Sequence, residues 1–326
     1  MIQIGVVGAG QLGSRHLQAL AFLREDCVIH VVDPSASSRE LALKRFKEET
    51  SRSTQIRTEF PVSISELPGN LDIVIIATNS DVRRQVIEQL LEHSRVKFLI
   101  LEKVLFQKLD DYDSIRKLLE THSVNAWVNC PRREWPSYRA LKRRLFGKQV
   151  YGVYVSGSNW GLGCNSIHII DLIAFLCGKS EYTLSTELLD PFLTPSKRSG
   201  FMEFTGILNG MFSSGPCFSI ASYAQGTLPD IIEVCGDGFR WIIRESEKKI
   251  WVSSDADQWH WLEESFDVPY QSKLTNLVIE RVLQTGECDL PTYPESALLH
   301  KTLLSGLLAH MTKIDPERTA NLCPIT

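Results

Sequence analysis

Hydrophobic and polar residues alternate in blocks along the first 130 positions. Short, nearly continuous apolar runs recur, as in strands that are buried on both faces of a sheet. These runs are IQIGVV at 2–7, CVIHVVD at 27–33, LDIVIIAT at 71–78, KFLILE at 97–102 and VNAWVN at 124–129. Between them, residues 11–23, 39–48, 81–93 and 111–120 carry apolar residues at helical spacing. This alternation predicts a parallel sheet with right-handed crossovers, in an open, doubly wound α/β domain.

The pattern changes after Lys148, where apolar and polar residues alternate with period two. Strand-like segments such as YGVYVSGSNW and FMEFTGILNGMFSS are interspersed with the turn-forming pairs Asn209-Gly210 and Asp237-Gly238. Helices are expected near the end, at 272–284 and 293–311. Because NCPRREWP interrupts the periodicity, we expect a first domain of residues 1–125. Residues 126–326 then form an α+β domain with an open, mostly antiparallel sheet.

A glycine-rich turn directly follows the first predicted strand. The sequence GAGQLG places Gly8, Gly10 and Gly13 in G-x-G-x-x-G spacing at the start of a helix. The first glycine allows a tight turn, the second lets a pyrophosphate approach the backbone, and the third lets helix and strand pack closely. Backbone N–H groups at the helix start, here around Gln11 and Leu12, can bind the anion. The first domain is therefore expected to be a dinucleotide-binding Rossmann domain.

An acidic residue stands at the end of the second predicted strand. Asp33 follows Gly13 by 20 positions, where a carboxylate can accept hydrogen bonds from both hydroxyls of a ribose. The same carboxylate repels a 2′-phosphate, so NAD is favoured as the cofactor. The nearby Arg39 keeps NADP as the less favoured alternative. The structural alternative for Asp33 is a cap or turn residue in the DPSAS loop.

Composition excludes several classes of partner. The net charge of −4 gives no global electrostatic reason to bind nucleic acid or anionic lipid. No apolar run approaches the roughly 18–20 residues that span a bilayer, and the N-terminus lacks the features of a signal peptide. We therefore expect a cytoplasmic protein. The eight cysteines show no C-x-x-C spacing, which argues against a zinc ribbon or a disulfide framework, and no metal is expected.

The apolar segment NWGLGCNSIHIIDLIAFLCG at 159–178 carries polar residues that a purely structural helix does not need. His168 is either a core histidine, half of a metal site with Cys164, or a group that faces a substrate. We favour the last interpretation, in which the Asn165 and His168 side of the helix lines a cleft between the domains at the nicotinamide edge. The apolar residues of the helix are expected to pack inward; they are Ile167, Ile169, Ile170, Leu172, Ile173 and Phe175.

Several of these features occur together in one known family. GAGQLGSRH with its histidine at 16, the ATNS turn, the Glu102-Lys103 pair at a strand end and the later H-x-x-D helix resemble the Gfo/Idh/MocA oxidoreductases. The resemblance spans nearly the whole chain. It implies that Thr78 and Asn79 lie in the loop that runs beside the ribose and nicotinamide of the cofactor. It also implies that Glu102 and Lys103 match the first two positions of the E-K-P motif, whose lysine reaches the nicotinamide and the reacting carbinol.

The same resemblance implies the substrate side of the site. His168 matches the histidine that projects over the substrate, and Asp171 matches the aspartate one turn later. Arg132 and Arg133 match an arginine-bearing stretch and could hold a carboxylate or phosphate of the substrate. The alternative for these arginines is a solvated helix face. For Lys103, the alternative is a pair with Glu102 or with solvent.

The chain also departs from the family pattern. Asn79 and Val104 stand where the family usually has proline, and Arg83 stands where it often has histidine. Cys164 stands where the family commonly has an acid that partners the histidine in proton transfer. These departures put the shape of two loops and the usual acid–histidine relay in question.

The activity implied by the resemblance is a hydride transfer between NAD and a hydroxyl or keto carbon of a sugar, cyclitol or nucleotide-linked sugar. Lys103 or His168 would handle the proton. The alternative is a dinucleotide-binding sensor or partner subunit without turnover. The exposed face of the second sheet, around FMEFTGILNGMFSS, predicts a homo-oligomer.

Overall fold

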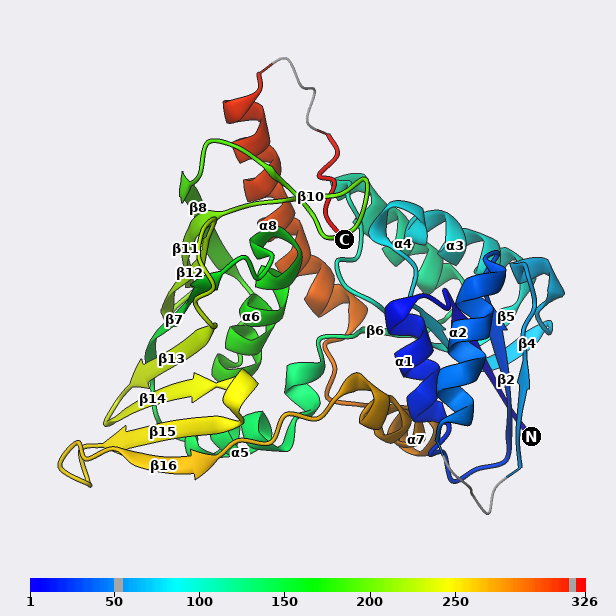
Figure 1. The fold of residues 1–326 in the computed structure, drawn as a ribbon, viewed down its shortest axis with the longest axis horizontal. Helices are drawn as coiled ribbons and strands as arrows, with labels where there is room; N and C mark the ends of the chain where they lie inside the picture. The colour runs from blue at the N-terminus through cyan, green and yellow to red at the C-terminus, as the bar shows by residue number, and fades with distance from the viewer. Residues whose placement is uncertain (50–54, 317–320) are drawn as a thin grey trace. The chain divides into compact units, whose positions relative to one another are not determined.

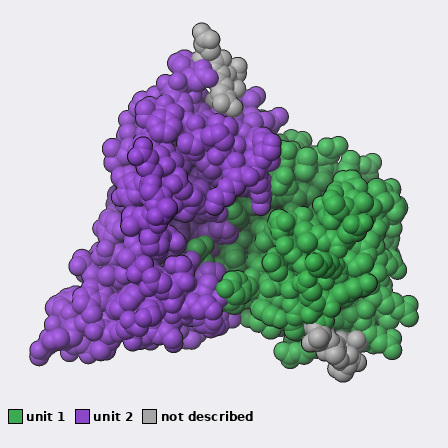
Figure 2. All heavy atoms as spheres, in the orientation of Figure 1, with its two compact units in different colours: residues 1–106, 110–134, 269–294 green, residues 107–109, 135–268, 295–326 purple. Residues whose placement is uncertain are grey.

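The computed structural model describes residues 1–49, 55–316 and 321–326. The chain forms two compact units, shown in different colours in Figure 2. Unit 1 comprises residues 1–106, 110–134 and 269–294, and unit 2 comprises residues 107–109, 135–268 and 295–326. Residues 126–134 and 269–294 were expected in the second domain from the sequence, but they lie in unit 1. The compact units are therefore not continuous in sequence.

The first sheet has six parallel strands in the order β3-β2-β1-β4-β5-β6. The strands, seen in Figure 1, are β1 (Ile2–Val7), β2 (Cys27–Val32), β3 (Ile56–Glu59), β4 (Asn70–Ile76), β5 (Arg95–Leu101) and β6 (Asn125–Val128). Five of them lie where the apolar runs predicted strands. The sequence missed β3, because its residues IRTE are at most half-buried and do not form an apolar run.

Helices connect the strands of unit 1. They are α1 (Gln11–Leu20), α2 (Ala36–Lys47), α3 (Ser80–His93) and α4 (Leu109–Thr121), with short 3₁₀ turns at η1 (Ile64–Glu66) and η2 (Pro131–Glu134). The strand order reverses between β1 and β4, since β2 and β3 lie on one side and β5 and β6 on the other. In an open α/β sheet, ligands bind at the carboxyl ends of the strands at such a switch point. The predicted doubly wound α/β fold is confirmed.

The returning segment contributes to the core of unit 1. It contains η4 (Gln271–Lys273) and α7 (Thr275–Thr285). Val278, Ile279 and Val282 of α7 are at most 3% exposed and join the same apolar cluster as the side chains of β1, β2 and β4. Further on, the N–H of Val128 donates to the carbonyl of Pro291, so the segment also lines the outer edge of β6. Burial of this apolar face explains why the chain returns to the first unit.

The second unit is built on an eight-stranded sheet in the order β16-β15-β14-β13-β7-β12-β11-β8. All neighbours are antiparallel except β7 and β12. The strands are β7 (Val150–Ser158), β8 (Tyr182–Leu189), β11 (Gly206–Phe212), β12 (Cys217–Tyr223), β13 (Ile231–Gly236), β14 (Phe239–Arg244), β15 (Lys249–Ser254) and β16 (Leu262–Ser265). A separate short pair joins β9 (Thr194–Pro195) to β10 (Met202–Glu203). The predicted open, mostly antiparallel second sheet is confirmed.

The helices of this unit are α5 (Pro136–Arg144), α6 (Leu162–Cys177) and α8 (Tyr293–Ile314), and η3 (Glu245–Glu247) is a 3₁₀ turn. The helix α6 corresponds to the apolar segment singled out in the sequence, and it contacts β10, β12 and α5. Its six apolar residues expected to face inward are all buried. The polar residues of α6 are therefore held in place by a well-packed helix.

One of the two expected hairpin turns is wrong. Asn209 and Gly210 lie inside β11 and pair with β12 and β8, whereas the turn falls at 213–215. Gly210 is needed for packing rather than for a turn, because a Cβ there would lie 2.3 Å from the ring of Phe218. The Asp237-Gly238 turn is confirmed, with Gly238 at φ +69° between β13 and β14.

Candidate active site

The glycine turn between β1 and α1 is shaped by two close approaches. A Cβ on Gly13 would lie 1.7 Å from the carbonyl oxygen of Gly8, and a Cβ on Gly8 would lie 2.9 Å from backbone atoms of Ala77 and Thr78. Gly8 also has φ +95°, a region that favours glycine. The turn is thus packed tightly against both its own helix and the loop after β4.

Gly10, in contrast, is surrounded by open space. A Cβ at this position would meet nothing within 4 Å, although the residue is the N-cap of α1. Its side chain cannot cap the helix, and the first-turn N–H groups around Gln11 and Leu12 point along the helix axis. Open space above uncapped N–H groups suits a pyrophosphate. The residues present therefore fit a dinucleotide.

Asp33 is tied to the glycine turn. Its Oδ2 accepts the N–H of Ala9 at 2.7 Å and its Oδ1 accepts the N–H of Ser35 at 2.8 Å. Each carboxylate oxygen can accept a second hydrogen bond, so the acceptors needed by a ribose diol remain. The guanidinium of Arg39 donates to the carbonyl of Asp33. Both the predicted acid and the neighbouring arginine thus lie beside the turn.

Arg45 on α2 is a neighbour of this turn that the sequence did not single out. It donates to the Gln11 carbonyl at 3.0 Å, to the Gln11 side chain at 2.7 Å and to Ser14 Oγ at 2.5 Å. Desolvation and the charge of Arg15 lower the pKa of Arg45 from its ordinary value. Only the pairing of α1 with α2 brings this cation to the glycine turn, so no local motif could reveal it.

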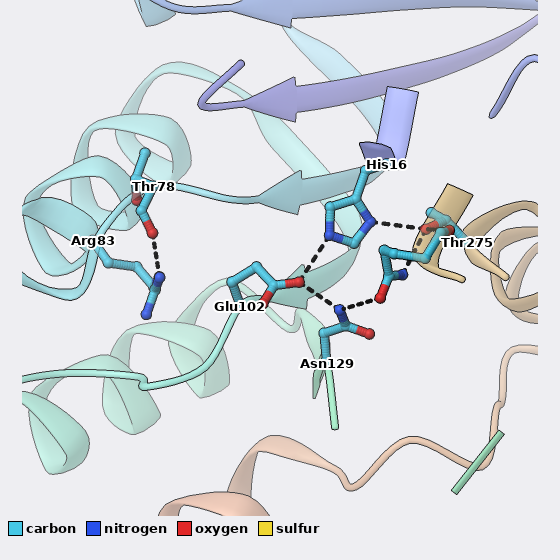
Figure 3. A network of polar contacts seen from close by, with 7 residues as sticks. His16, Thr78, Arg83, Glu102, Asn129 and Thr275 are labelled. Carbon is cyan, nitrogen blue, oxygen red and sulfur yellow. Dashed lines mark hydrogen bonds and ion pairs between the residues drawn. The ribbon is translucent and has the colours of Figure 1, made fainter. Parts of the chain in front are cut away.

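The loop after β4 carries Thr78 and Asn79. Asn79 is the N-cap residue of α3, and the carbonyl of Thr78 accepts a hydrogen bond from Arg83 (Figure 3). The hydroxyl oxygen of Thr78 is buried and has no hydrogen-bond partner among the described residues. A buried hydroxyl without a partner is costly, which points to a group from outside the protein at this position.

Glu102 lies in a closed ring of buried polar side chains, most of which Figure 3 labels. Its Oε1 lies 2.8 Å from Nε2 of His16 and also accepts from Asn129. Asn129 donates to Gln271 at 3.1 Å, Gln271 donates to Thr275 at 2.8 Å, and Thr275 Oγ1 lies 2.8 Å from Nδ1 of His16. The ring joins α1, β5 and the start of α7 within unit 1.

The donors and acceptors of this ring determine the proton on His16. The Thr275 hydroxyl accepts from Nε2 of Gln271 and donates to the Gln271 carbonyl at 3.3 Å. The ionised carboxylate of Glu102 can only accept a hydrogen bond, so Nε2 of His16 is assigned the proton that it donates to Glu102. Burial opposes the charged form of Glu102, but the hydrogen bonds from His16 and Asn129 outweigh it, so the pKa of Glu102 lies below its ordinary value. Glu102 is therefore an internal anion that fixes the end of β5.

Lys103 follows directly at the carboxyl end of β5 and is half-buried. The peptide bond between Lys103 and Val104 is cis. The predicted cofactor residues are Gly8, Gly10, Gln11, Leu12, Gly13, Asp33, Thr78, Asn79, Glu102 and Lys103, and all of them lie in unit 1. Arg132 and Arg133 also lie in unit 1, in the turn η2, with Arg133 6% exposed.

The remaining predicted residues lie on α6 in unit 2. Asn165 donates from Nδ2 to the carbonyl of Trp160 at 2.6 Å, His168 is half-buried, and Asp171 is fully buried. Asp171 is therefore not a surface residue. Among the described residues, no group of three or more His, Cys, Asp or Glu side chains could hold a metal ion.

A carboxylate that the sequence did not predict lies at the start of α6. Glu203 of β10 is 9% exposed, and its Oε2 accepts the N–H of Gly163 at 2.8 Å and that of Cys164 at 3.3 Å. A Cβ on Gly161 would lie 2.9 Å from Cys164 Sγ, 3.2 Å from Asn165 Nδ2 and 3.2 Å from Glu203 Oε1. An acid from a distant strand thus stands beside Cys164, the position where the family commonly has an acid.

The fold and the glycine turn define a dinucleotide-binding protein of the Rossmann type. Residues 2–130 match the family model described as "Oxidoreductase family, NAD-binding Rossmann fold", so this part of the chain is similar to the Gfo/Idh/MocA family. No curated protein matches the sequence. Among the described residues, no helix has both the length and the apolar character to cross a membrane.

Solved structures with the same fold extend the similarity to 96% of the chain. An Agrobacterium radiobacter oxidoreductase in complex with NAD⁺, L-tartaric acid and magnesium has 13% identity and a TM-score of 0.70, over 97% of its own length. The UDP-N-acetylglucosamine 3-dehydrogenase GnnA of Acidithiobacillus ferrooxidans has 13% identity and a TM-score of 0.70, over 99% of its length. The transcriptional regulator Gal80p of Kluyveromyces lactis has 13% identity and a TM-score of 0.68, over 93% of its length. The fold therefore occurs in both enzymes and a regulator.

Proposed function

We propose that the protein is an NAD-dependent oxidoreductase that acts on a CH–OH group of a sugar, a cyclitol or a nucleotide-linked sugar. The observation that carries the proposal is the glycine turn. Gly13 and Gly8 close the turn, Gly10 leaves space above the helix start, and Asp33 stands beside Ala9. The fold neighbours include a structure with bound NAD⁺ and a UDP-sugar dehydrogenase, which supports the cofactor and the substrate class.

Bound NAD supplies a hydride acceptor at its nicotinamide ring. The task of the protein is then to orient the carbinol and to accept its hydroxyl proton. We assign the proton to Lys103 or His168, and we assign substrate contacts to Asn165, Arg132 and Arg133. On the substrate side, Asp171 is fully buried, so we assign it to orienting the imidazole of His168. Lys103 belongs to unit 1 and His168 to unit 2.

The acid–histidine relay expected from the family needs a different acid here. Glu203 offers its carboxylate at the first turn of α6, one turn before His168. It fixes the turn that presents Asn165 and His168. This supports retention of the site despite Cys164.

The second candidate function is a dinucleotide sensor without turnover. It is favoured by the similarity to Gal80p and by the burial of Glu102 in an internal ring. A single measurement distinguishes the two functions, because only the enzyme changes the redox state of its cofactor.

The first test is calorimetry of the purified protein with NAD and NADP, followed by absorbance at 340 nm with a panel of sugars, polyols and UDP-sugars. We expect micromolar NAD binding, weaker NADP binding and reduction of NAD by at least one substrate of this class. Turnover should fall about a hundredfold or more in His168→Ala with NAD affinity unchanged. Binding without turnover would favour the sensor, and a folded protein that binds neither dinucleotide would refute both functions.

A further inference from the structure

Arg83 is the feature of unit 1 that the proposed function leaves unexplained. It lies in the first turn of α3, is 1% exposed and is among the largest fully buried side chains of the described chain. Its Nη1 donates to the carbonyls of Val104 and Leu105, the latter at 2.9 Å, and its Nη2 donates to the carbonyl of Thr78. Figure 3 shows the contact with Thr78 beside the ring around Glu102.

These carbonyls belong to two separate loops. Thr78 follows β4, and Val104 and Leu105 follow β5, so one guanidinium joins the carboxyl ends of two neighbouring strands. Neither loop contains a proline within residues 77–79 or 102–105, so no ring fixes φ in either segment. The hydrogen bonds of Arg83 supply a constraint that the covalent backbone of these loops lacks.

The chemistry of arginine suits this role. A buried cation is strongly unfavourable unless its N–H groups find acceptors. A planar guanidinium presents several donors in a fixed fork and can hold carbonyls on two segments at one separation. A lysine ammonium would keep the charge but not the fork. The site is therefore built for the shape of arginine as well as for its charge.

The two loops lie where the second half of a dinucleotide belongs. Asp33 and β2 lie on one side of the switch point between β1 and β4, and the Arg83-bound loops follow β4 and β5 on the other side. A Cβ on Gly8 would lie 2.9 Å from backbone atoms of Ala77 and Thr78, so the glycine turn packs directly against the Thr78 loop. The buried Thr78 hydroxyl, which has no partner among the described residues, lies in the segment that Arg83 holds.

We propose that Arg83 is the positioning residue for the nicotinamide end of the cofactor site: it holds the Thr78 loop and the Val104 loop at the separation that receives the nicotinamide ring. The adenosine half, at Asp33, does not depend on it. This inference rests on the proposed function, because it presupposes that NAD binds at the glycine turn.

The experiment compares NAD with ADP-ribose, which lacks the nicotinamide ring. Calorimetry measures both dissociation constants for the wild type and for Arg83→Met, which keeps much of the side-chain volume but removes the donors. We expect the wild type to bind NAD about five- to tenfold more tightly than ADP-ribose. In Arg83→Met this ratio should fall to about one while ADP-ribose affinity stays within about twofold.

The matched control is Arg84→Met on the same helix. Arg84 is 41% exposed and pairs with Glu88 and Asp111 instead of with the loops. Both ligands should bind this variant as they bind the wild type. Circular dichroism checks that each variant is folded. If Arg83→Met does not fold, Arg83→Lys is measured in its place.

If Arg83 had only a structural role, Arg83→Met would bind NAD and ADP-ribose more weakly to the same extent. That result overturns the inference. Equal wild-type affinity for NAD and ADP-ribose, or an unchanged ratio in the variant, also overturns it. Failure of the proposed function is recognised separately, because the wild type would then bind neither ligand.

Discussion

Gly10 and Gly13 show two different physical demands for the same residue type. Gly13 is required by packing, because any side chain would meet the Gly8 carbonyl at 1.7 Å. Gly10 has open space around its Cα, so the fold itself tolerates a side chain there. The spacing motif assigns these two roles by position, and the backbone geometry shows the steric reason for each.

This difference gives a paired prediction. Gly10→Ala should fold normally, because its φ of −64° is open to any L-residue, but its methyl group should occupy the space of a pyrophosphate and weaken NAD binding about tenfold or more. Gly13→Ala should destabilise unit 1 by about 1–3 kcal/mol, because helix and strand must separate. Urea unfolding and calorimetry with NAD measure the two effects. Unimpaired NAD binding by Gly10→Ala would contradict the placement of the diphosphate.

At the scale of elements, the ring around Glu102 ties together segments far apart in sequence. His16 of α1 and Thr275 of α7 are 259 positions apart, and Asn129 and Gln271 are 142 positions apart. Together with the apolar face of α7, this ring attaches residues 269–294 to the Rossmann sheet. It also fixes the strand end that carries Lys103.

The lowered pKa of Glu102 predicts how the stability of unit 1 depends on pH. The stabilisation from ionised Glu102 is fully present above the ordinary glutamate pKa of about 4.3 and is lost as the pH falls through the lower pKa of the folded state. At pH 7, Glu102→Gln should cost about 3 kcal/mol of unfolding free energy. The difference from the wild type should shrink below about pH 4.

Urea unfolding at several pH values checks this prediction. Glu120→Gln is the control, because Glu120 is 62% exposed and forms a surface pair with Arg116. It should change stability little at any pH. A difference between wild type and Glu102→Gln that stays constant from pH 7 to pH 3 would argue against an ionised Glu102.

At the scale of the whole molecule, the second sheet presents large apolar side chains to solvent. They lie on β7, β8, β11 and β12, and they are Tyr151, Tyr154, Leu188, Met211 and Tyr223. A monomer rarely exposes such a set on one sheet. A second copy of the chain would bury this face with twofold symmetry, since each sheet can present the same residues to the other.

We therefore predict an oligomer that depends on this face. Light scattering after gel filtration should show a mass of at least twice 36.9 kDa for the wild type. Met211→Lys, at a residue 56% exposed on β11, should shift the mass toward the monomer. Leu277→Lys on α7 is the control, with 47% exposure in unit 1, and should leave the mass unchanged. A monomeric wild type would refute the prediction.

The sequence by itself determined the elements that depend on local periodicity and on steric demands of single residues. Continuous apolar runs gave five of the six strands of the first sheet, and the glycine spacing with Asp33 marked the turn that the structure shows. These signals are readable because a buried strand or a tight turn restricts residue type at fixed, nearby positions. The sequence placed a turn at Asn209-Gly210 wrongly, because close packing against Phe218 also requires glycine at position 210.

Tertiary structure alone decided the features that join distant segments. The return of residues 269–294 to unit 1, the ring around Glu102, the approach of Glu203 to Cys164 and the bonds from Arg83 to two loops depend on which surfaces meet. A buried cation can be satisfied by any acceptors, and a buried anion by any donors, that the fold brings within about 3 Å. Neither the identity of these partners nor their distance in the sequence is encoded in a local pattern. The physical reason is that a buried polar group needs a hydrogen-bond partner, and the topology of the chain decides which groups lie close enough to be that partner.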